Sequence, residues 1–377
     1  MKNPFIFSRP ITDPKNFFDR EEELGEIFKG IRNQYNISLI GERKIGKTSL
    51  LNMVCHPDKM REYGVNTEKT LIVSIDSSDI EKGESISVWR HLLSLLYEEI
   101  QDENVKEELN GKVTSSYVRF SDVVKTLSHV EKDVVLIFDE FEAIGKNMKS
   151  DFFENLRHLA QKPKLTCIVS TCRDLLRMTK DRAVGSSPLF NVFVTYFLGL
   201  FSENQSKGFI KIKFKNMEIQ EKHINSILEI CGPHPFFIQL FCSLLFESLI
   251  DEESNLTFQD AIKKTIPAFT EYSDIHFKYY WSRFDETEKD ILLDIALEKK
   301  TDHDFEYNIV HDLERRGFLV RNKGKYKIFS RIFEEWILKH KKRIKGQNPF
   351  IRAIVFSILL MFVIIFLWIV VNLIFKN

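Results

Sequence analysis

The sequence has no excess of charge of either sign and contains few cysteines. Lys and Arg together number 54, Asp and Glu together also number 54, and the formal net charge is therefore zero. A neutral chain has no global field to draw it to nucleic acid. The five cysteines show no C-x-x-C and no other metal-ligand spacing, which predicts reduced, mostly buried thiols of a cytosolic domain.

The N-terminus lacks the pattern of a secretory signal. It reads MKNPFIFSRPITDP, with no long apolar core behind a basic start. We therefore expect no signal peptide. With 377 residues, the chain is long enough for two or three compact domains.

Residues 41–48 read GERKIGKT, the pattern G-x-x-x-x-G-K-T, between an apolar run at 37–40 and a helix-like run that starts SLL. Backbone N–H groups in such a loop converge on phosphate oxygens, and the following helix N-terminus favours an anion. Lys47 would reach the β- and γ-phosphates, Thr48 would ligate Mg²⁺, and Gly46 would allow close approach of the backbone. The alternative is a chance glycine turn before a helix. The predicted nucleotide-binding residues of this stretch are Gly41, Glu42, Arg43, Lys44, Ile45, Gly46, Lys47, Thr48 and Ser49.

A second motif, DVVLIFDEFE at 133–142, is an apolar run that ends in acids. A strand buried on both faces delivers carboxylates to its C-terminal edge in this way. Asp139 would hold Mg²⁺ through water, and Glu140 would be the base that orients and deprotonates the attacking water. Alternatively, these acids only cap the helix that begins near Phe141.

A third run, KLTCIVSTCRDLL at 164–176, is a buried strand followed by small polar residues and an arginine. Ser170 or Thr171 could read the γ-phosphate, and Arg173 could neutralise charge there as a catalytic group. The alternative is a surface arginine after a strand.

Strand-like runs at 37–40, 70–75, 134–138, 165–170 and 192–198 alternate with amphipathic helical stretches. This alternation predicts an α/β fold with a parallel sheet covered on both faces and a nucleotide at its C-terminal edge. From about 202 to 270 helical periodicity takes over. Within it, Gly232, Pro233 and Pro235 break one helix and start another, which could pack a small helical domain onto the nucleotide or be an ordinary turn.

The composition changes again after residue 284. FDETEKDILLDIAL predicts a capped amphipathic helix, and YNIVHDLERRGFLV predicts a second helix that stops at Gly317. LVRNKGKYKIFS predicts two short strands around Lys323 and Gly324. Helices followed by a β-hairpin suggest a winged-helix module.

The run AIVFSILLMFVIIFLWIVV at 353–371 carries no charge and is about as long as the ~20 residues that a helix needs to cross a ~30 Å hydrocarbon core. The basic stretch KHKKRIKGQNPFIR precedes it, whereas only Lys376 is basic after it. The positive-inside tendency therefore predicts a single membrane span with the N-terminal domains in the cytoplasm. The alternative is a buried core helix.

Together, these motifs resemble the STAND class of P-loop ATPases, in particular the archaeal ATPase-like members related to the Orc/Cdc6 and NB-ARC groups. The resemblance covers about residues 16–340 and includes the upstream FFDREEEL box, the phosphate loop, LIFDEFE, STCRD, SPLFNVF, GPHP and YKIFSRIFEEW. It implies that Arg20 lies beside the adenine and that Pro235 with His234 is the sensor element of the helical domain. The family box usually has Gly where this chain has Asp19.

The resemblance implies a P-loop NTPase parallel sheet with a helical lid and a winged helix, and the apolar run near the C-terminus adds an expected transmembrane helix. The expected divisions are an N-terminal segment at 1–15, the ATPase core at 16–200, the lid at 201–275, the winged helix at 280–340, a basic linker at 341–352 and the span at 353–375.

The expected function is that of a membrane-anchored switch with ATP or ADP and Mg²⁺ as ligands. In this class ADP locks the helical and winged-helix domains onto the core, exchange for ATP releases them for self-association, and slow hydrolysis resets the switch. A protein partner is also expected, of unknown identity. The alternative is a DNA-binding ATPase of Orc/Cdc6 type, whose winged helix contacts phosphates through Arg315, Arg316, Arg321, Lys323, Lys325 and Lys327.

Overall fold

The computed structural model describes residues 2–77, 85–101, 103, 106–107, 116–173, 175, 189–251, 256–298, 307–322 and 324–345. The expected span at 353–375 and the part of the linker after 345 lie outside these residues. Among the helices that the structure describes, none is both long and apolar enough for a membrane crossing.

Within the described residues, the α/β part contains 3-10 helices as well as α-helices and strands. Its elements are η1 Pro14–Asn16, α1 Glu21–Asn33, β1 Asn36–Ile40, α2 Lys47–Val54, α3 Pro57–Glu62, β2 Thr70–Asp76, α4 Ser85–Glu99, α6 Ser116–His129, β3 Asp133–Asp139, α7 Glu142–Asn147, α8 Ser150–Leu159, β4 Leu165–Thr171, η3 Leu189–Val192 and β5 Phe193–Phe197. The elements of the second part are α10 Glu203–Lys213, α11 Glu221–Cys231, α12 Pro235–Ile250, α13 Phe258–Arg283, α14 Glu286–Ala296, α15 Tyr307–Arg315, β6 Leu319–Asn322, β7 Lys325–Ile328 and α16 Arg331–Lys345.

The central sheet has five strands in the order β2-β3-β4-β1-β5, and every neighbouring pair is parallel. The predicted parallel sheet is therefore confirmed, with each strand within a residue or two of the expected bounds. Strand β4 lies between β1 and β3, so the strand before the phosphate loop and the strand with the two acids are not direct neighbours. The carboxyl ends of all three strands still meet at one edge.

Helices cover both faces of the sheet. Successive strand residues point to opposite faces, so each strand contributes side chains to the cores on both sides. In β3, Leu136 and Phe138 pack into the core formed with α4, α6 and α8, whereas Ile137 packs into the core formed with α1 and α2. Both faces of β3 are therefore apolar, which explains its continuous hydrophobic run.

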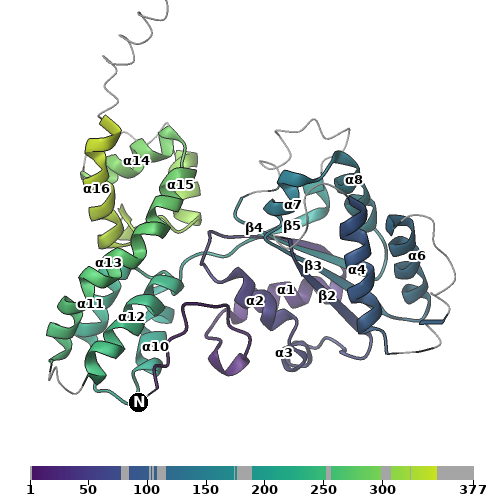
Figure 1. The fold of residues 1–377 in the computed structure, drawn as a ribbon, viewed down its shortest axis with the longest axis horizontal. Helices are drawn as coiled ribbons and strands as arrows, with labels where there is room; N and C mark the ends of the chain where they lie inside the picture. The colour runs from purple at the N-terminus through teal and green to yellow at the C-terminus, as the bar shows by residue number, and fades with distance from the viewer. Residues whose placement is uncertain are drawn as a thin grey trace, which may run out of the picture.

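Helices α10 to α16 and the β6–β7 hairpin form a second body beside the sheet (Figure 1). Phe237 of α12 lies within its core, with its ring centroid 5.2 Å from that of Phe277 in α13 and 5.9 Å from that of Phe329, which follows β7. The sequence predicted a boundary at 275–280, but α13 runs through it because Phe269, Phe277 and Tyr280 continue one buried face. The predicted lid and winged-helix segments thus share one core, which we call the helical body (residues 201–345).

Local signals set the helix ends as the sequence indicated. Helix α11 ends at Cys231 and α12 begins with Pro235 at its first position. Helix α14 begins at a capping box, in which Asp285 accepts from the N–H of Glu288 and the Glu288 side chain accepts from the N–H of Asp285. Strands β6 and β7 pair antiparallel, with Asn322 opposite Lys325, as the expected hairpin requires.

Residues 3–11 form a strap that joins the helical body to the helix after the phosphate loop. Asn3 donates to the Ser243 hydroxyl at 3.0 Å, and the N–H of Ile6 donates to Gln239 at 2.9 Å, both on α12. At the other end, the N–H of Ile11 donates to the Ser49 hydroxyl of α2 at 3.0 Å. The sequence assigned no role to this segment.

We predict that Gly232→Ala destabilises the helical body more than Gly324→Ala. Both glycines have a positive φ, +70° at Gly232 and +80° at Gly324, where alanine is strained by about 1–2 kcal/mol. At Gly232 ψ is 178°, a region that is essentially restricted to glycine, where strain reaches about 1–3 kcal/mol. Only at position 232 would a Cβ meet a neighbour, 2.2 Å from the Phe329 carbonyl oxygen, which adds about 1–3 kcal/mol. The midpoint of thermal unfolding measures the difference, and equal midpoints for the two variants would contradict it.

Candidate functional site

The phosphate loop leaves β1 at the carboxyl edge of the sheet and leads into α2, which begins at Lys47. A Cβ at Gly41 would lie 2.8 Å from the Leu198 carbonyl oxygen, so this position admits no side chain. Gly46 has φ of +107°, a conformation that L-residues avoid. The sequence argument required Gly46 for approach of a phosphate. The structure adds a second reason for glycine at this position, because the positive φ favours glycine whether or not a ligand is bound.

Lys47 is buried at the centre of this loop. Its ammonium donates to the Gly41 carbonyl oxygen at 2.8 Å and to the Glu42 carbonyl oxygen at 3.3 Å, both within the loop. Burial by itself disfavours the charge, but the neighbouring groups Cys172, Glu142 and Asp139 outweigh it and raise the pKa of Lys47. A permanent positive charge is thus fixed where the loop curves.

The two predicted magnesium ligands meet although Thr48 lies at the start of α2 and Asp139 lies at the end of β3. The Thr48 hydroxyl donates to one carboxylate oxygen of Asp139 at 2.6 Å, and the Ser170 hydroxyl at the end of β4 donates to the other at 2.6 Å. Hydroxyl and carboxylate oxygens are hard ligands of the kind that Mg²⁺ prefers. The donor set therefore fits that ion, and Ser170, a candidate phosphate reader, braces Asp139.

Glu140 follows Asp139 in an unusual backbone conformation with φ of +48°. Its N–H donates to the Asp139 carboxylate at 3.0 Å, which stabilises this conformation. Burial, and then the nearby Glu142, raise the pKa of Glu140 against the opposing effect of Arg43 and Lys47. A carboxylate with a raised pKa is a better proton acceptor near neutral pH, as the predicted base role requires.

A cleft of about 280 Å³ opens over the loop, and most of the predicted residues line it. The predicted site residues that line the cleft are Arg43, Lys44, Gly46, Lys47, Thr48, Ser49, Glu140 and Pro235. The residues that the sequence analysis missed are Ile6, Phe7, Arg9, Pro10, Ile11, Asp76, Phe236 and Gln239. The sequence contained a signal for Asp76, because this residue ends the apolar run LIVSID in the same way that Asp139 ends the run before it. In the structure Asp76 pairs with Asp139. The strap had no such signal.

Arg20 and His234, expected beside the nucleotide, do not line this cleft. The Arg20 guanidinium donates to the Gly199 carbonyl oxygen at 2.7 Å and lies 4.7 Å from the Phe201 ring centroid, so it joins α1 to the segment before α10. Burial, together with the charges of His276 and Arg20, lowers the pKa of His234 to about 3, and its ring caps α12. Asp19 has φ of +60°, which explains why glycine suits that position of the box.

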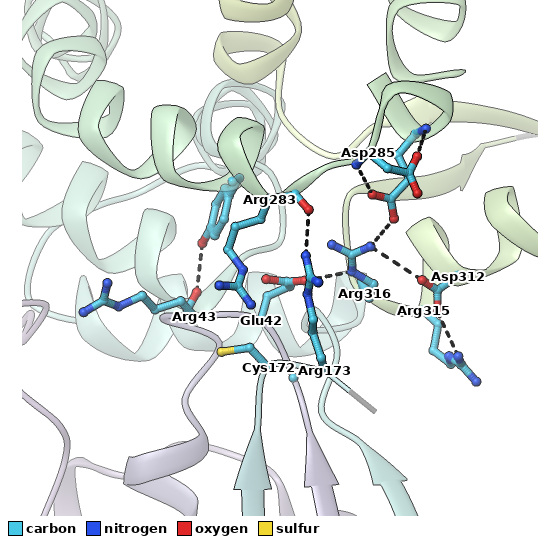
Figure 2. A network of polar contacts seen from close by, with 12 residues as sticks. Glu42, Arg43, Cys172, Arg173, Arg283, Asp285, Asp312, Arg315 and Arg316 are labelled. Atoms are coloured by element: carbon cyan, nitrogen blue, oxygen red, sulfur yellow. Dashed lines mark hydrogen bonds and ion pairs between the residues drawn. The ribbon is translucent and has the colours of Figure 1, made fainter. Parts of the chain in front are cut away.

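Arg173 and Thr171 are also engaged elsewhere. Arg173 donates to the carbonyl oxygen of Arg283, the last residue of α13, at 2.8 Å (Figure 2). The Thr171 hydroxyl donates to the Arg173 carbonyl oxygen at 2.6 Å. In this arrangement the predicted charge-neutralising arginine points to the helical body.

Figure 2 shows the polar network in which the helical body meets the carboxyl ends of the strands. Arg316, just after α15, donates to Glu42 of the phosphate loop at 2.8 Å and to Glu288 of α14 at 2.5 Å. The Glu42 side chain is only 6% exposed, so this predicted nucleotide-binding side chain is committed to an ion pair with the helical body.

The expected DNA-contacting set is only partly available. Arg316 is engaged in the ion pairs above, Arg315 pairs with Asp312 at 2.9 Å, and Arg321 pairs with Glu314 at 3.0 Å. Lys323 lies outside the described residues, and Lys325 and Lys327 are exposed. In this arrangement Arg316 is engaged at the junction of the two bodies, so it is not free to contact a DNA phosphate.

Comparisons with known proteins agree with this architecture. The family described as Novel STAND NTPase 2 matches residues 32–299. Among the curated proteins compared, none matches the chain. A Walker-type ATPase of Pyrococcus abyssi has a TM-score of 0.55 at 18% identity, covering 88% of this chain and 99% of its own. The ORC2 protein of Aeropyrum pernix, in ADPNP-ADP complexes, has a TM-score of 0.56 at 11% identity, covering 89% and 98%. At these identities the likeness shows a shared fold, which confirms the expected similarity to Orc/Cdc6-type structures.

We predict that Asp139→Asn weakens Mg²⁺-dependent nucleotide binding by about 10- to 100-fold, because an amide loses the charge that orients the metal-bound water. Asp133→Asn, at the opposite end of β3, is the matched control and should bind as wild type. Titration of a fluorescent ADP analogue at varied Mg²⁺ measures the effect. If Asp139→Asn kept the wild-type Mg²⁺ dependence, the metal assignment would fail.

Proposed function

Because the chain belongs to the Novel STAND NTPase 2 family, we propose that it is a nucleotide-controlled switch that binds ATP or ADP with Mg²⁺ and hydrolyses ATP slowly. The observation that carries this proposal is the position of the phosphate loop. On its inner side Lys47 and Thr48 line the cleft, and on its outer side Arg316 and Tyr280 of the helical body contact it. A loop contacted from both sides lets the contents of the cleft bias the position of the helical body.

Lys47, Thr48 and Glu140 of the cleft, together with Asp139, have separate roles in this proposal. Lys47 would bring its charge to the β- and γ-phosphates. Thr48 and Asp139 would hold Mg²⁺, which neutralises phosphate charge when bound. Glu140 would accept a proton from the attacking water, favoured by its raised pKa. Pro235 and the strap would close the cleft opposite the loop.

The contacts between the two bodies indicate which nucleotide state the described arrangement represents. Arg173 is bound to the end of α13 and Glu42 is bound to Arg316, so we assign the described arrangement to the closed, ADP-preferring state. A γ-phosphate would compete for Arg173 and favour release of the helical body for self-association. The Aeropyrum pernix ORC2 protein, of the same fold, was solved in ADPNP-ADP complexes and in an ADP form, which supports adenine nucleotides as ligands here.

The proposal extends to the membrane, where the span at 353–375 would anchor the switch with its domains in the cytoplasm. Helix α16 reaches Lys345, only a few residues before the apolar run. Movement of the helical body would therefore act next to the bilayer. Signalling or defence through nucleotide-controlled assembly, with a protein partner still to be identified, is the role that this layout suits.

We predict that Glu140→Gln keeps ATP binding but slows hydrolysis by about 100-fold or more, because the amide is no base. The trapped ATP form should self-associate, whereas the ADP form should stay in its resting state. Light scattering on the detergent-solubilised chain measures the mass in each state. Lys47→Ala, which removes the charge at the phosphates, should bind no nucleotide, and Lys59→Ala on α3 should behave as wild type. Equal masses with ATP and ADP would contradict the switch.

We predict that the full chain resists extraction from membranes by carbonate and that a chain ending at Gly346 is soluble and still binds nucleotide. Apolar residues near the centre of a span each favour insertion by several tenths of a kcal/mol, and a basic cluster adds about 1 kcal/mol per charge at an anionic leaflet. Carbonate release of the full chain would disprove the anchor. A soluble truncation that bound no nucleotide would show instead that the tail belongs to the ATPase fold.

A further inference from the structure

The phosphate loop is held on its outer side by two groups from the helical body. The Tyr280 hydroxyl donates to the Arg43 carbonyl oxygen at 2.8 Å, and Arg316 donates to the Glu42 carboxylate at 2.8 Å. Positions 42 and 43 are variable positions of the motif, and no phosphate chemistry requires a carboxylate at the first of them. The charge of Glu42 therefore needs a separate explanation.

Arg316 is itself rigidly placed. Its guanidinium lies 5.5 Å from the Phe284 ring centroid and 5.1 Å from that of Phe318. It also donates to one oxygen of Glu288, whose other oxygen accepts from the Asp285 N–H in the capping box of α14. The position of Arg316 therefore depends on the positions of α14 and α15.

The pair with Glu42 is buried on both sides, with side chains 12% and 6% exposed. A carboxylate left buried without its partner is strongly destabilising. If the helical body moved away, Glu42 would lose the Arg316 guanidinium and meet solvent in its place. The Glu42 carbonyl oxygen also accepts from Lys47 at 3.3 Å, so a change at Glu42 reaches the lysine of the cleft through one residue.

We propose that Arg316 is a positioning residue for the phosphate loop, which acts on nucleotide through Glu42 and couples nucleotide affinity to docking of the helical body. This inference rests on the proposed function. Coupling of two binding equilibria is reciprocal, so docking strengthens ADP binding by the factor by which ADP strengthens docking. In this proposal the contact between Glu42 and Arg316 produces the coupling, and Glu288 holds the Arg316 guanidinium in place.

The test uses the full chain in detergent and a fluorescent ADP analogue. Glu42→Gln and Arg316→Met should each raise the Kd for ADP at least about fivefold, the lower end of typical coupling factors. Arg316→Lys, which keeps the charge but not the fork, should raise the Kd less than Arg316→Met. The double variant Glu42→Gln/Arg316→Met should lose less than the product of the single losses, because both changes remove one contact. Arg321→Met, in the hairpin, is the matched control.

A second readout separates coupling from a merely structural role. At saturating ADP, amide exchange in β6 should slow in wild type and in Arg321→Met, because ADP strengthens docking. In Glu42→Gln the same saturation should leave β6 exchange unchanged. Glu42→Gln is expected to fold even if Arg316→Met does not, since Arg316 keeps Glu288 and Asp312 as partners.

The outcomes separate the two levels of the proposal. Absence of ADP binding in wild type would refute the proposed function itself. Wild-type binding with an unchanged Kd in Glu42→Gln, losses that multiply in the double variant, or ADP-induced slowing of β6 exchange in Glu42→Gln would each overturn the coupling alone.

Discussion

The parallel register of β1, β4 and β3 is the constraint on which the site depends. Ile40 pairs with Thr171, and Phe138 pairs with Val169, so the three strands end at nearly one level. The phosphate loop, the hydroxyls of β4 and the acids of β3 therefore emerge together at one edge. A shift of one residue in β3 would turn Asp139 to the other face and break its bonds to Thr48 and Ser170.

Two chemical environments lie on either side of the phosphate loop. The cleft side carries groups whose charges are left for a ligand, chiefly Lys47 and Glu140. On the outer side Arg316 is engaged within the protein, because Glu42, Glu288 and Asp312 all pair with it. Buried ion pairs contribute little net stability compared with apolar packing, but they demand one geometry. A junction built from them can specify how the two bodies meet without making the contact permanent.

The apolar cores of the two bodies are separate, and this division fits a movable junction. The sheet has a core on each face, and the helical body has its own, to which Phe5 of the strap also belongs. The strap crosses between the bodies through hydrogen bonds at Gln239 and Ser49. Leu200 packs against both the helical-body core and the core under α1 and α2, so the junction also contains an apolar contact.

Local signals in the sequence determined much of this molecule. The five apolar runs became the five strands, and the glycines, Lys47 and Thr48 stand where the loop pattern requires them. The breaks at Gly232 and Pro235 and the capping box at Asp285 set helix ends. Each of these features depends on neighbours within a few positions along the chain, which is why periodicity and capping rules could find it.

Tertiary structure alone decided the contacts between distant segments. Nothing near Arg316 indicates that it pairs with Glu42, 274 positions away, and nothing near Ile11 indicates a bond to Ser49. For the same reason the sequence did not indicate that α13 joins two predicted domains or that Arg20 donates to the Gly199 carbonyl oxygen. The sequence determines which side chains are charged and which strand ends carry them, but only packing of the two bodies decides which charges face the cleft and which are paired behind it.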